Sequence, residues 1–284
     1  MAPRVMEELV DRLAHMEALD SVARPLSKKV AALVPTGLVK DTLSGTWLGH
    51  PLHPMLTDLP IGSWTSAMVL DFVGGKRGRP AADRLVALGV VTALPTAVSG
   101  LADWSDTLGE ERRLGLVHAA GNVVAVTLYG SSWLARRRGK RVRGVFLGLL
   151  GGTAATLGAY LGGHLAWRKG VNIDRHAWDH PSDEWADVAA EDELEEGKPV
   201  AVTAADGPVL LIRDRGVVRA IADVCGHAGG PLHEGEIDDG CVTCPWHASV
   251  FRLDDGSVVH GPATGPQPAY DVRMAAGRVS VRRR

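Results

Sequence analysis

Long apolar segments alternate with short charged ones between about residue 59 and residue 167 of this 284-residue chain. Three of them, residues 85–102, 114–135 and 144–167, carry almost no charge and reach the ~20 residues that an α-helix needs to cross a bilayer. A fourth, 59–73, contains Asp71 and reaches that length only as 55–75. A water-soluble bundle would need a polar stripe on each helix, and these segments have none. The pattern therefore predicts four transmembrane helices.

The pattern changes after residue 174, where charged residues become frequent and apolar runs become short. Turn signals such as Asp206-Gly207 and Asp254-Asp255-Gly256 separate short segments that favour β-structure. Strands are predicted at 199–202, 209–212, 217–222, 240–243, 250–253, 269–273 and 278–281. Residues 191–197 are expected to form a short acidic turn or helix. Together these segments predict a small antiparallel sandwich.

The predicted fold class is multidomain: an all-α four-helix transmembrane bundle followed by an all-β antiparallel sandwich. The expected divisions are an amphipathic helical segment over 1–42, the membrane domain over 43–172, a linker over 173–186 and the β domain over 187–284. Residues 1–20 are charged and lack the apolar core of a cleavable signal peptide. The acidic stretch over 174–196 favours a solvated connector, with a docking face for a basic partner as the alternative.

Lys and Arg gather in two of the three predicted loops, at 76–84 and 136–143, whereas the loop at 103–113 is mainly acidic. Loops rich in Lys and Arg stay in the cytoplasm, so both chain ends are expected outside it. Cysteines without a disulfide are more typical of the cytoplasm. We expect a multi-pass protein of a bacterial plasma membrane. The side of the β domain stays open, with the charge count favouring the outer face.

Two mixed Cys–His pairs provide the most specific chemical signal in the chain. The first is Cys225-Gly226-His227, and after sixteen residues Cys244-Pro245-Trp246-His247 follows. Two thiolates on one iron and two imidazoles on the other are the ligands of a Rieske [2Fe–2S] centre. Zinc is the alternative, although zinc fingers usually group two Cys and then two His.

The residues around these pairs resemble the Rieske ferredoxin family over about 187–282. Gly230-Pro231-Leu232 follows the first pair, and Asp255-Gly256, Gly261-Pro262 and Pro268 follow the second. The resemblance implies a [2Fe–2S] cluster on Cys225, His227, Cys244 and His247. It also implies that six further residues surround the cluster: Gly230, Pro231, Pro245, Trp246, Ser249 and Phe251.

The resemblance also bears on the reduction potential. Respiratory Rieske proteins join their two loops by a disulfide, and the matching positions here are Gly230 and Trp246. Ser249 matches a hydroxyl near the respiratory cluster, but Phe251 replaces a tyrosine. Fewer hydrogen bonds to sulfur stabilise the reduced cluster less. We expect a ferredoxin-like potential, in the lower half of the Rieske range of roughly −150 to +300 mV.

The remaining Cys and His residues of the β half give weaker signals. Cys241 lies in a predicted strand and is expected in the core. His233 and His260 are expected in surface loops. His176 and His180, with nearby Asp174 and Asp179, have the composition of a metal-binding cluster but lie in a polar linker.

The membrane half shows a second resemblance. Gly49-His50-Pro51-Leu52-His53-Pro54-Met55 and Gly162-Gly163-His164 are similar to the opening and closing segments of a family of small bacterial four-helix membrane proteins of unknown function. The resemblance covers roughly 43–172 and implies a fold without an activity. With four spans, His50, His53, His118 and His164 lie toward one membrane face. Paired imidazoles are haem b ligands or frame a quinone site, and His118 with His164 is the first pair considered.

The sequence predicts a membrane-anchored one-electron carrier. It lacks a Gly-x-Gly-x-x-Gly nucleotide motif and the length for an oxygenase domain, so its role is expected to be electron transfer within an oxidoreductase system. One alternative is a membrane protein with two redox cofactors, and another is a redox-sensing interaction module. The expected partners are the lipid bilayer and an unidentified redox protein, with no nucleic acid.

Overall fold

The computed structural model describes residues 2–284; Met1, the first residue of the N-terminal stretch, lies outside the described residues. The chain forms two compact units. The first comprises Met1–Val34 and Leu52–Val171, and the second comprises Pro35–Pro51 and Asn172–Arg284. Helices fill the first unit and strands dominate the second, which confirms the predicted fold class.

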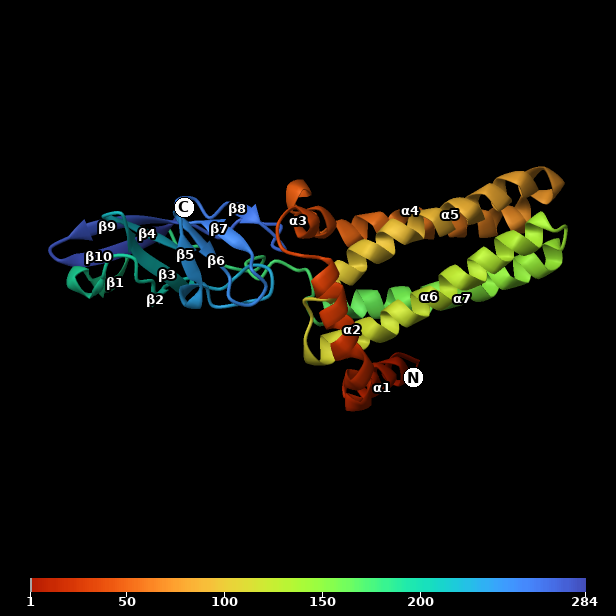
Figure 1. The fold of residues 1–284 in the computed structure, drawn as a ribbon, viewed down its shortest axis with the longest axis horizontal. Helices are drawn as coiled ribbons and strands as arrows, with labels where there is room; N and C mark the ends of the chain where they lie inside the picture. Colours follow the sequence, from red (N-terminus) through yellow and green to blue (C-terminus); the bar gives the residue numbers. More distant parts are fainter. Residues whose placement is uncertain (1) are drawn as a thin grey trace. The chain divides into compact units, whose positions relative to one another are not determined.

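Four long helices build the first unit: α4 (Leu52–Val73), α5 (Gly75–Trp104), α6 (Gly109–Arg137) and α7 (Arg141–Trp167). They pack as two antiparallel hairpins, α4 with α5 and α6 with α7 (Figure 1). The predicted apolar segments lie inside these helices, but α5 begins ten residues before its segment and includes the basic stretch at Lys76. A single residue, Gly74, separates the end of α4 from the start of α5. The turn between the two helices is therefore tight, and the basic stretch lies inside α5.

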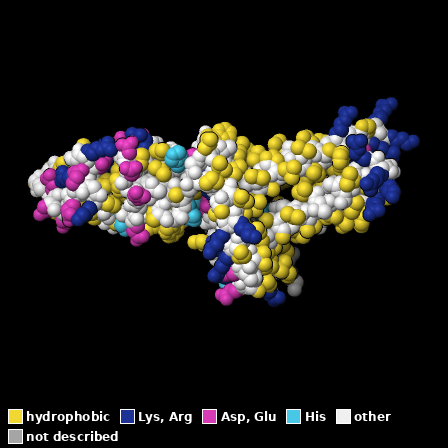
Figure 2. Space-filling model, in the orientation of Figure 1, with side chains coloured by type: hydrophobic (Ala, Val, Ile, Leu, Met, Phe, Trp, Pro, Cys, Tyr) yellow, Lys and Arg dark blue, Asp and Glu magenta, His cyan; other side chains and the backbone are white. Residues whose placement is uncertain are grey.

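In the described part of the chain, three helices are long and apolar enough to cross a membrane: α5, α6 and α7. Helix α4 has 22 residues and is not one of these three; Asp58, Pro60 and Asp71 interrupt its apolar sequence. The four predicted helices are therefore all present, and three of them have the composition of membrane spans. Figure 2 shows apolar side chains along the exposed sides of this unit. Large exposed residues such as Phe72, Leu94 and Val123 suit a lipid surface better than water.

The two hairpins meet at an aromatic pair. The rings of Trp64 and Tyr129 are stacked, with centroids 4.1 Å apart. Two glycines make room for these rings: a Cβ on Gly89 would lie 2.3 Å from the Trp64 indole nitrogen, and one on Gly151 would lie 2.9 Å from the Tyr129 ring. Small residues are what allow membrane helices to pack closely.

A buried charge network closes the hairpin-turn end of the first unit. The Arg136 guanidinium contacts Asp71 and donates to Asp83 at 3.0 Å, and Arg141 contacts the same two carboxylates. The side chains of Arg136 and Asp71 are almost fully buried. Other Lys and Arg side chains cluster around this end (Figure 2). In the sequence, Asp71 was the charge that interrupted the first apolar segment. In the structure this charge is neutralised within the bundle by Arg136 and Arg141.

The N-terminal stretch forms α1 (Ala2–Ala14), the 3₁₀ turn η1 (Glu17–Leu19) and α2 (Asp20–Leu33). Val10 and Ala14 of α1 are buried against Leu114 of α6. Arg113 of α6 also contacts α2, because its guanidinium donates two hydrogen bonds of 2.9 Å to the Asp20 carboxylate. These helices therefore pack against the end of the bundle that lies away from the hairpin turns.

Three small antiparallel sheets build the second unit. Their orders are β1-β10-β9, β2-β3-β4 and β5-β6-β7-β8. The strands are β1 (Ala186–Ala190), β2 (Val200–Ala204), β3 (Gly207–Asp214), β4 (Val217–Ala222), β5 (Glu236–Asp238), β6 (Cys241–Thr243), β7 (Val250–Arg252), β8 (Val258–His260), β9 (Tyr270–Ala275) and β10 (Arg278–Arg283). The seven predicted strands correspond to seven of these. The acidic stretch forms the 3₁₀ turn η3 (Glu191–Glu193), as expected.

Three strands, β1, β5 and β8, had no clear signal in the sequence. Strands β5 and β8 have three residues each, too few for an alternating pattern. Cys241 begins β6, but it is half-buried rather than a core residue. The prediction of a core position for Cys241 was wrong, because the four-stranded sheet is narrow and one face of β6 lies close to solvent.

Residues 35–51 belong to the β-rich unit although they precede the long helices. They form α3 (Leu38–Ser44) and the 3₁₀ turn η2 (Thr46–Leu48). The Asp41 carboxylate accepts a hydrogen bond from the Gly261 amide at 2.7 Å and lies 2.9 Å from His260 Nδ1. Thr46 donates to the Ala263 carbonyl at 3.2 Å. His260 is exposed, as predicted, but it is also one of the contacts that hold α3 in place.

Candidate metal centre

Two loops of the β-rich unit carry the predicted ligands. The first runs from the end of β4 to the 3₁₀ turn η4 (Leu232–Glu234), and the second connects β6 to β7. Both repeat one hydrogen-bond pattern: the amide of each Cys donates to the carbonyl five residues later, and its carbonyl accepts from the amide four residues later. Gly229 and Ala248, the fourth residues after each Cys, both have positive φ, at 89° and 58°. The sequence thus builds the same tight turn twice.

The structure brings the predicted ligands together as two pairs, one of thiols and one of imidazoles. Cys225 and Cys244 are 1% and 3% exposed and pack in one cluster with Phe251 and Leu232. The His227 and His247 rings lie edge to face, with centroids 5.1 Å apart. The Nδ1 atoms of both rings are buried.

The electrostatics of the two thiols differ. A hydrogen bond from Cys225 and the backbone N–H groups of Trp246 and His247 lower the pKa of Cys244 to about 6. The same hydrogen bond, together with burial, raises the pKa of Cys225. Backbone N–H groups of His227 and Ala228 point at Cys225 and favour its thiolate. The loops therefore offer amide donors to both sulfurs, as a site for bound thiolates requires.

The imidazole of His227 is held in its neutral form. Burial, followed by the neighbouring His247 ring and the charges of Lys40 and Arg175, lowers the pKa of His227 to about 3. A neutral imidazole is the form that binds a metal.

The arrangement separates the two kinds of ligand into two pairs. Zinc needs four donors around one point. Among residues 2–284, no three His, Cys, Asp or Glu side chains converge closely enough to hold one metal ion. The thiols instead form one pair and the imidazoles another, which is the division that a [2Fe–2S] centre with Cys₂ and His₂ ligation needs.

The other residues expected around the cluster lie in or beside the two loops. Gly230 of the first loop lies close to the second loop, since a Cβ there would lie 2.8 Å from Cys244 Sγ and 3.1 Å from the Trp246 ring. Pro231 precedes η4, and Pro245 and Trp246 lie in the second loop. Ser249 is fully buried and accepts a hydrogen bond from the Ala263 amide at 3.0 Å. Phe251 is buried beneath the cysteines.

Gly230 and Trp246 are neighbours, as the comparison with respiratory proteins implied. The contact of the Gly230 position with the Trp246 ring shows that these two positions face each other across the loops. The indole ring of Trp246 packs against the Gly230 backbone. The two loops therefore contact each other by packing at this point.

A buried glutamine connects the first loop to the sheet behind it. The Gln267 amide accepts from the Gly226 N–H at 2.8 Å and donates to the Val224 and Ala222 carbonyls at 2.8 and 3.1 Å. Its side chain thus fixes the backbone on both sides of Cys225. No motif in the sequence indicated this role of Gln267.

We expect Gln267→Ala to destabilise the cluster-binding unit by about 1–3 kcal/mol, because it leaves buried backbone groups without partners. The measurement is the urea concentration at which full-length protein loses half its visible cluster absorbance. Glu195→Ala, at an exposed position, is the control and is expected to leave that midpoint unchanged. An equal midpoint for both variants would contradict the role assigned to Gln267.

The segment after α7 packs on the first loop and is not a free connector. The Arg175 amide donates to the Gly226 carbonyl at 3.0 Å. His176 Nε2 lies 2.7 Å from the Val224 carbonyl, and its Nδ1 lies 2.7 Å from the Asp179 carboxylate. These contacts explain the spacing of Asp174, His176 and Asp179 in the sequence: they tie the chain to the ligand loop. The sequence indicated only a polar linker here, because nothing in residues 174–179 shows which distant loop they contact.

The predicted membrane histidines do not come together as one group. His53 in α4 and His118 in α6 are neighbours, with ring centroids 6.4 Å apart. His118 contacts the Gly158 carbonyl, and His164 lies six residues, about 9 Å of helix, further along α7. His50 is exposed and belongs to the other unit. The pair considered first, His118 with His164, is thus not the one that the fold brings together.

Comparisons with known proteins agree with this site. Residues 184–271 match the Rieske [2Fe-2S] domain, and residues 49–175 match the predicted membrane protein family DUF2231. The anthranilate 1,2-dioxygenase ferredoxin subunit of Burkholderia cepacia is 35% identical over 98 residues, which are 34% of this chain and 91% of that protein. The ferredoxin component of the naphthalene 1,2-dioxygenase system of Pseudomonas aeruginosa is 25% identical over 35% of this chain and 96% of that protein.

Among solved structures, the ferredoxin of carbazole 1,9a-dioxygenase from Nocardioides aromaticivorans IC177 is 29% identical, with a TM-score of 0.34. The match covers 35% of this chain and 98% of that one. The family match and the identity to the Burkholderia cepacia ferredoxin subunit show that the C-terminal domain is a [2Fe–2S] electron-transfer domain homologous to dioxygenase ferredoxins. The chain belongs to the Rieske [2Fe–2S] family, and its residues 49–175 match the predicted membrane protein family DUF2231.

Proposed function

We propose that the protein is a membrane-anchored one-electron carrier whose cluster is held by Cys225, His227, Cys244 and His247. The observation that carries the proposal is the pairing of two buried thiols and of two edge-to-face imidazoles on two loops with the same hydrogen-bond pattern. When bound, a Rieske cluster accepts and releases a single electron. The chain's own residues hold the ligands, donate amides to the sulfurs and keep His227 neutral.

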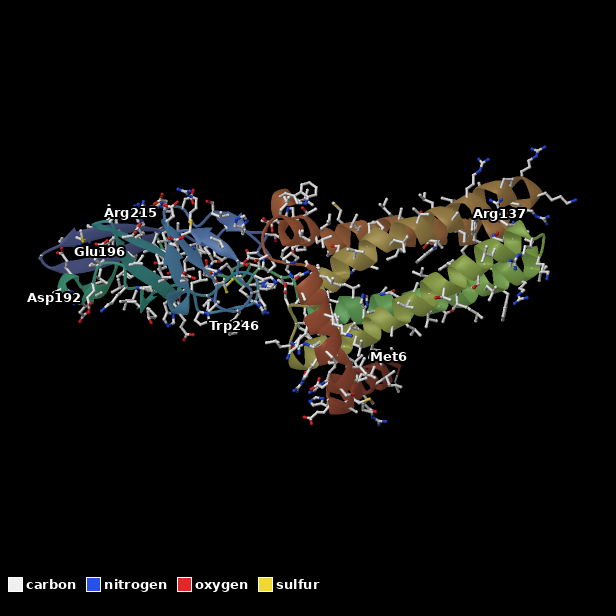
Figure 3. All side chains as sticks on the ribbon, in the orientation of Figure 1. Met6, Arg137, Asp192, Glu196, Arg215 and Trp246 are labelled. Atoms are coloured by element: carbon white, nitrogen blue, oxygen red, sulfur yellow. The ribbon has the colours of Figure 1, made fainter. Side chains whose placement is uncertain are left out.

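The second loop is the proposed site of electron entry and exit. Trp246 is 53% exposed and Pro245 beside it is exposed. The Trp246 and His247 rings lie edge to face with centroids 6.5 Å apart. Figure 3 labels Trp246 at one end of the β-rich unit and Asp192 and Glu196 toward the other. A partner protein would therefore approach the Trp246 surface, and the acidic stretch around η3 lies away from it.

The membrane half is proposed as the anchor. Helices α5, α6 and α7 have the composition of spans, and we propose that α4, packed along α5, crosses with them. The basic hairpin-turn end would face the cytoplasm of a bacterial cell. With four crossings, the chain ends would lie on the outer side. Relatives named as ferredoxins of dioxygenase systems support an oxidoreductase partner, but the membrane domain favours a partner at the bilayer.

Electron paramagnetic resonance of full-length protein in detergent tests the proposal. Dithionite-reduced protein is expected to give the rhombic signal of a reduced Rieske centre, with two iron atoms per chain. Iron-replete protein without that signal, or with zinc in place of iron, would overturn the proposal. The midpoint potential, followed through the same signal, is expected in the lower half of roughly −150 to +300 mV.

Lys40 is expected to raise this potential. It is almost fully buried, and its charge is close enough to act on His227. A positive charge stabilises the reduced, more negative cluster. We expect Lys40→Gln to lower the midpoint by about 40 mV, the equivalent of roughly 1 kcal/mol for one electron. Redox titration compares it with Lys198→Gln, an exposed lysine, which is expected to leave the potential unchanged. Equal potentials in both variants would exclude an electrostatic role for Lys40.

A further inference from the structure

A pair of imidazoles bridges the two helix hairpins of the membrane unit. His53 stands at the start of α4 and His118 in the second turn of the apolar part of α6, so each hairpin supplies one ring. Their planes are nearly perpendicular, at 87°, and their centroids are 6.4 Å apart. Neither ring takes part in the centre on the β-rich unit.

Both rings are held by the same kind of contact. His53 Nδ1 lies 2.9 Å from the Thr96 carbonyl of α5, and His118 Nδ1 lies 2.8 Å from the Gly158 carbonyl of α7. A carbonyl oxygen only accepts hydrogen bonds, so Nδ1 must carry the proton of each neutral ring. The lone pair is then on Nε2 in both rings. Histidines that bind a metal are commonly fixed in this way, with the other ring nitrogen donating to a backbone carbonyl.

Glycines on the adjacent helices accommodate the two rings. A Cβ on Gly100 would lie 2.6 Å from His53 Cε1, and one on Gly162 would lie 3.0 Å from His118 Cε1. The rings thus press against bare backbone on α5 and α7, which leaves them little freedom to turn. Asn122 donates to His118 Nε2 at 3.1 Å, and this is the hydrogen bond that a metal would replace.

We propose that His53 and His118 are the two axial ligands of a b-type haem. An iron ion bound by two imidazoles at about 2 Å each places their centroids about 6 Å apart, close to the observed separation. No third His, Cys, Asp or Glu joins the pair among the described residues, so a bare ion would have only two protein ligands. A porphyrin supplies the other four. A quinone is a poorer fit, because its carbonyls need a donor and both Nε2 atoms are acceptors.

The optical spectrum of full-length protein tests this proposal. The protein is produced with ample iron and haem precursor and purified in detergent. A Soret band that shifts on dithionite reduction, with about one haem per chain by pyridine haemochromogen, is the expected result. His53→Ala and His118→Ala are each expected to lose at least nine-tenths of the haem. His164→Ala, a histidine toward the same end of the bundle, is the matched control and is expected to retain it.

A conservative variant separates ligation from folding. His118→Met is expected to retain haem with a shifted reduced spectrum and a raised haem potential, which a merely structural histidine would not produce. Absence of a Soret band in haem-replete wild-type protein would overturn the proposal, as would haem retained in both alanine variants. The electron paramagnetic resonance signal of the Rieske centre is measured on the same samples. It reports on the proposed electron carrier independently, so that failure of one proposal is distinguishable from failure of the other.

Discussion

Replacing Cys244 by serine is expected to abolish the Rieske signal. Its thiol lies 3% exposed within the core cluster and accepts amide donors from its own loop, so a serine hydroxyl would leave a weak ligand in a site shaped for thiolate. We expect less than a tenth of the wild-type signal per chain and a parallel loss of iron. The spins of the reduced protein are counted by electron paramagnetic resonance, and the iron content of the full-length chain is measured on the same sample.

Cys241→Ser is the matched control, because it makes the same chemical change three residues earlier. Cys241 is half-buried at the start of β6 and its sulfur lies 3.8 Å from the Asp239 carbonyl, away from the two loops. This variant is expected to keep the full signal. A normal cluster in Cys244→Ser, or its loss in Cys241→Ser, would contradict the ligand assignment.

Replacing Arg136 by leucine is expected to destabilise the membrane unit by about 3 kcal/mol. The Arg136 side chain is 1% exposed and contacts the carboxylates of Asp71 and Asp83, one of them almost as buried as itself. Removing one partner of a buried pair leaves a charge without compensation, which typically costs about 3–5 kcal/mol. The lower end applies because Arg141 still contacts both carboxylates. Thermal unfolding of full-length protein in detergent measures the effect.

Arg138→Leu provides the comparison for this prediction. Arg138 is exposed just after the end of α6, and its replacement is expected to leave the unfolding temperature nearly unchanged. Figure 3 labels the neighbouring Arg137, whose side chain also lies at this end of the bundle. A loss of stability as large in Arg138→Leu as in Arg136→Leu would show that net basic charge, and not the buried pair, stabilises this end.

The sequence determined the features that depend on short-range chemistry. The Cys225–His227 and Cys244–His247 pairs specify a cluster because few other sites mix thiolate and imidazole at this spacing. The long apolar segments predict membrane helices, because about 20 apolar residues in an α-helix span the bilayer and satisfy their own backbone hydrogen bonds. Seven strands followed from local alternation and turns, whereas three-residue strands such as β5 carry too little pattern to be recognised.

The tertiary structure decided which distant residues meet. Asp41 and Lys40, far from the ligand loops in the chain, pack on the β-rich unit, and Gln267 fixes the first loop from behind. His118 pairs with His53 because the hairpins place the start of α4 beside α6, while His164 lies further along α7. Periodicity places a residue on one face of one element. It does not determine which element packs against that face, since that depends on the combined packing of the whole chain.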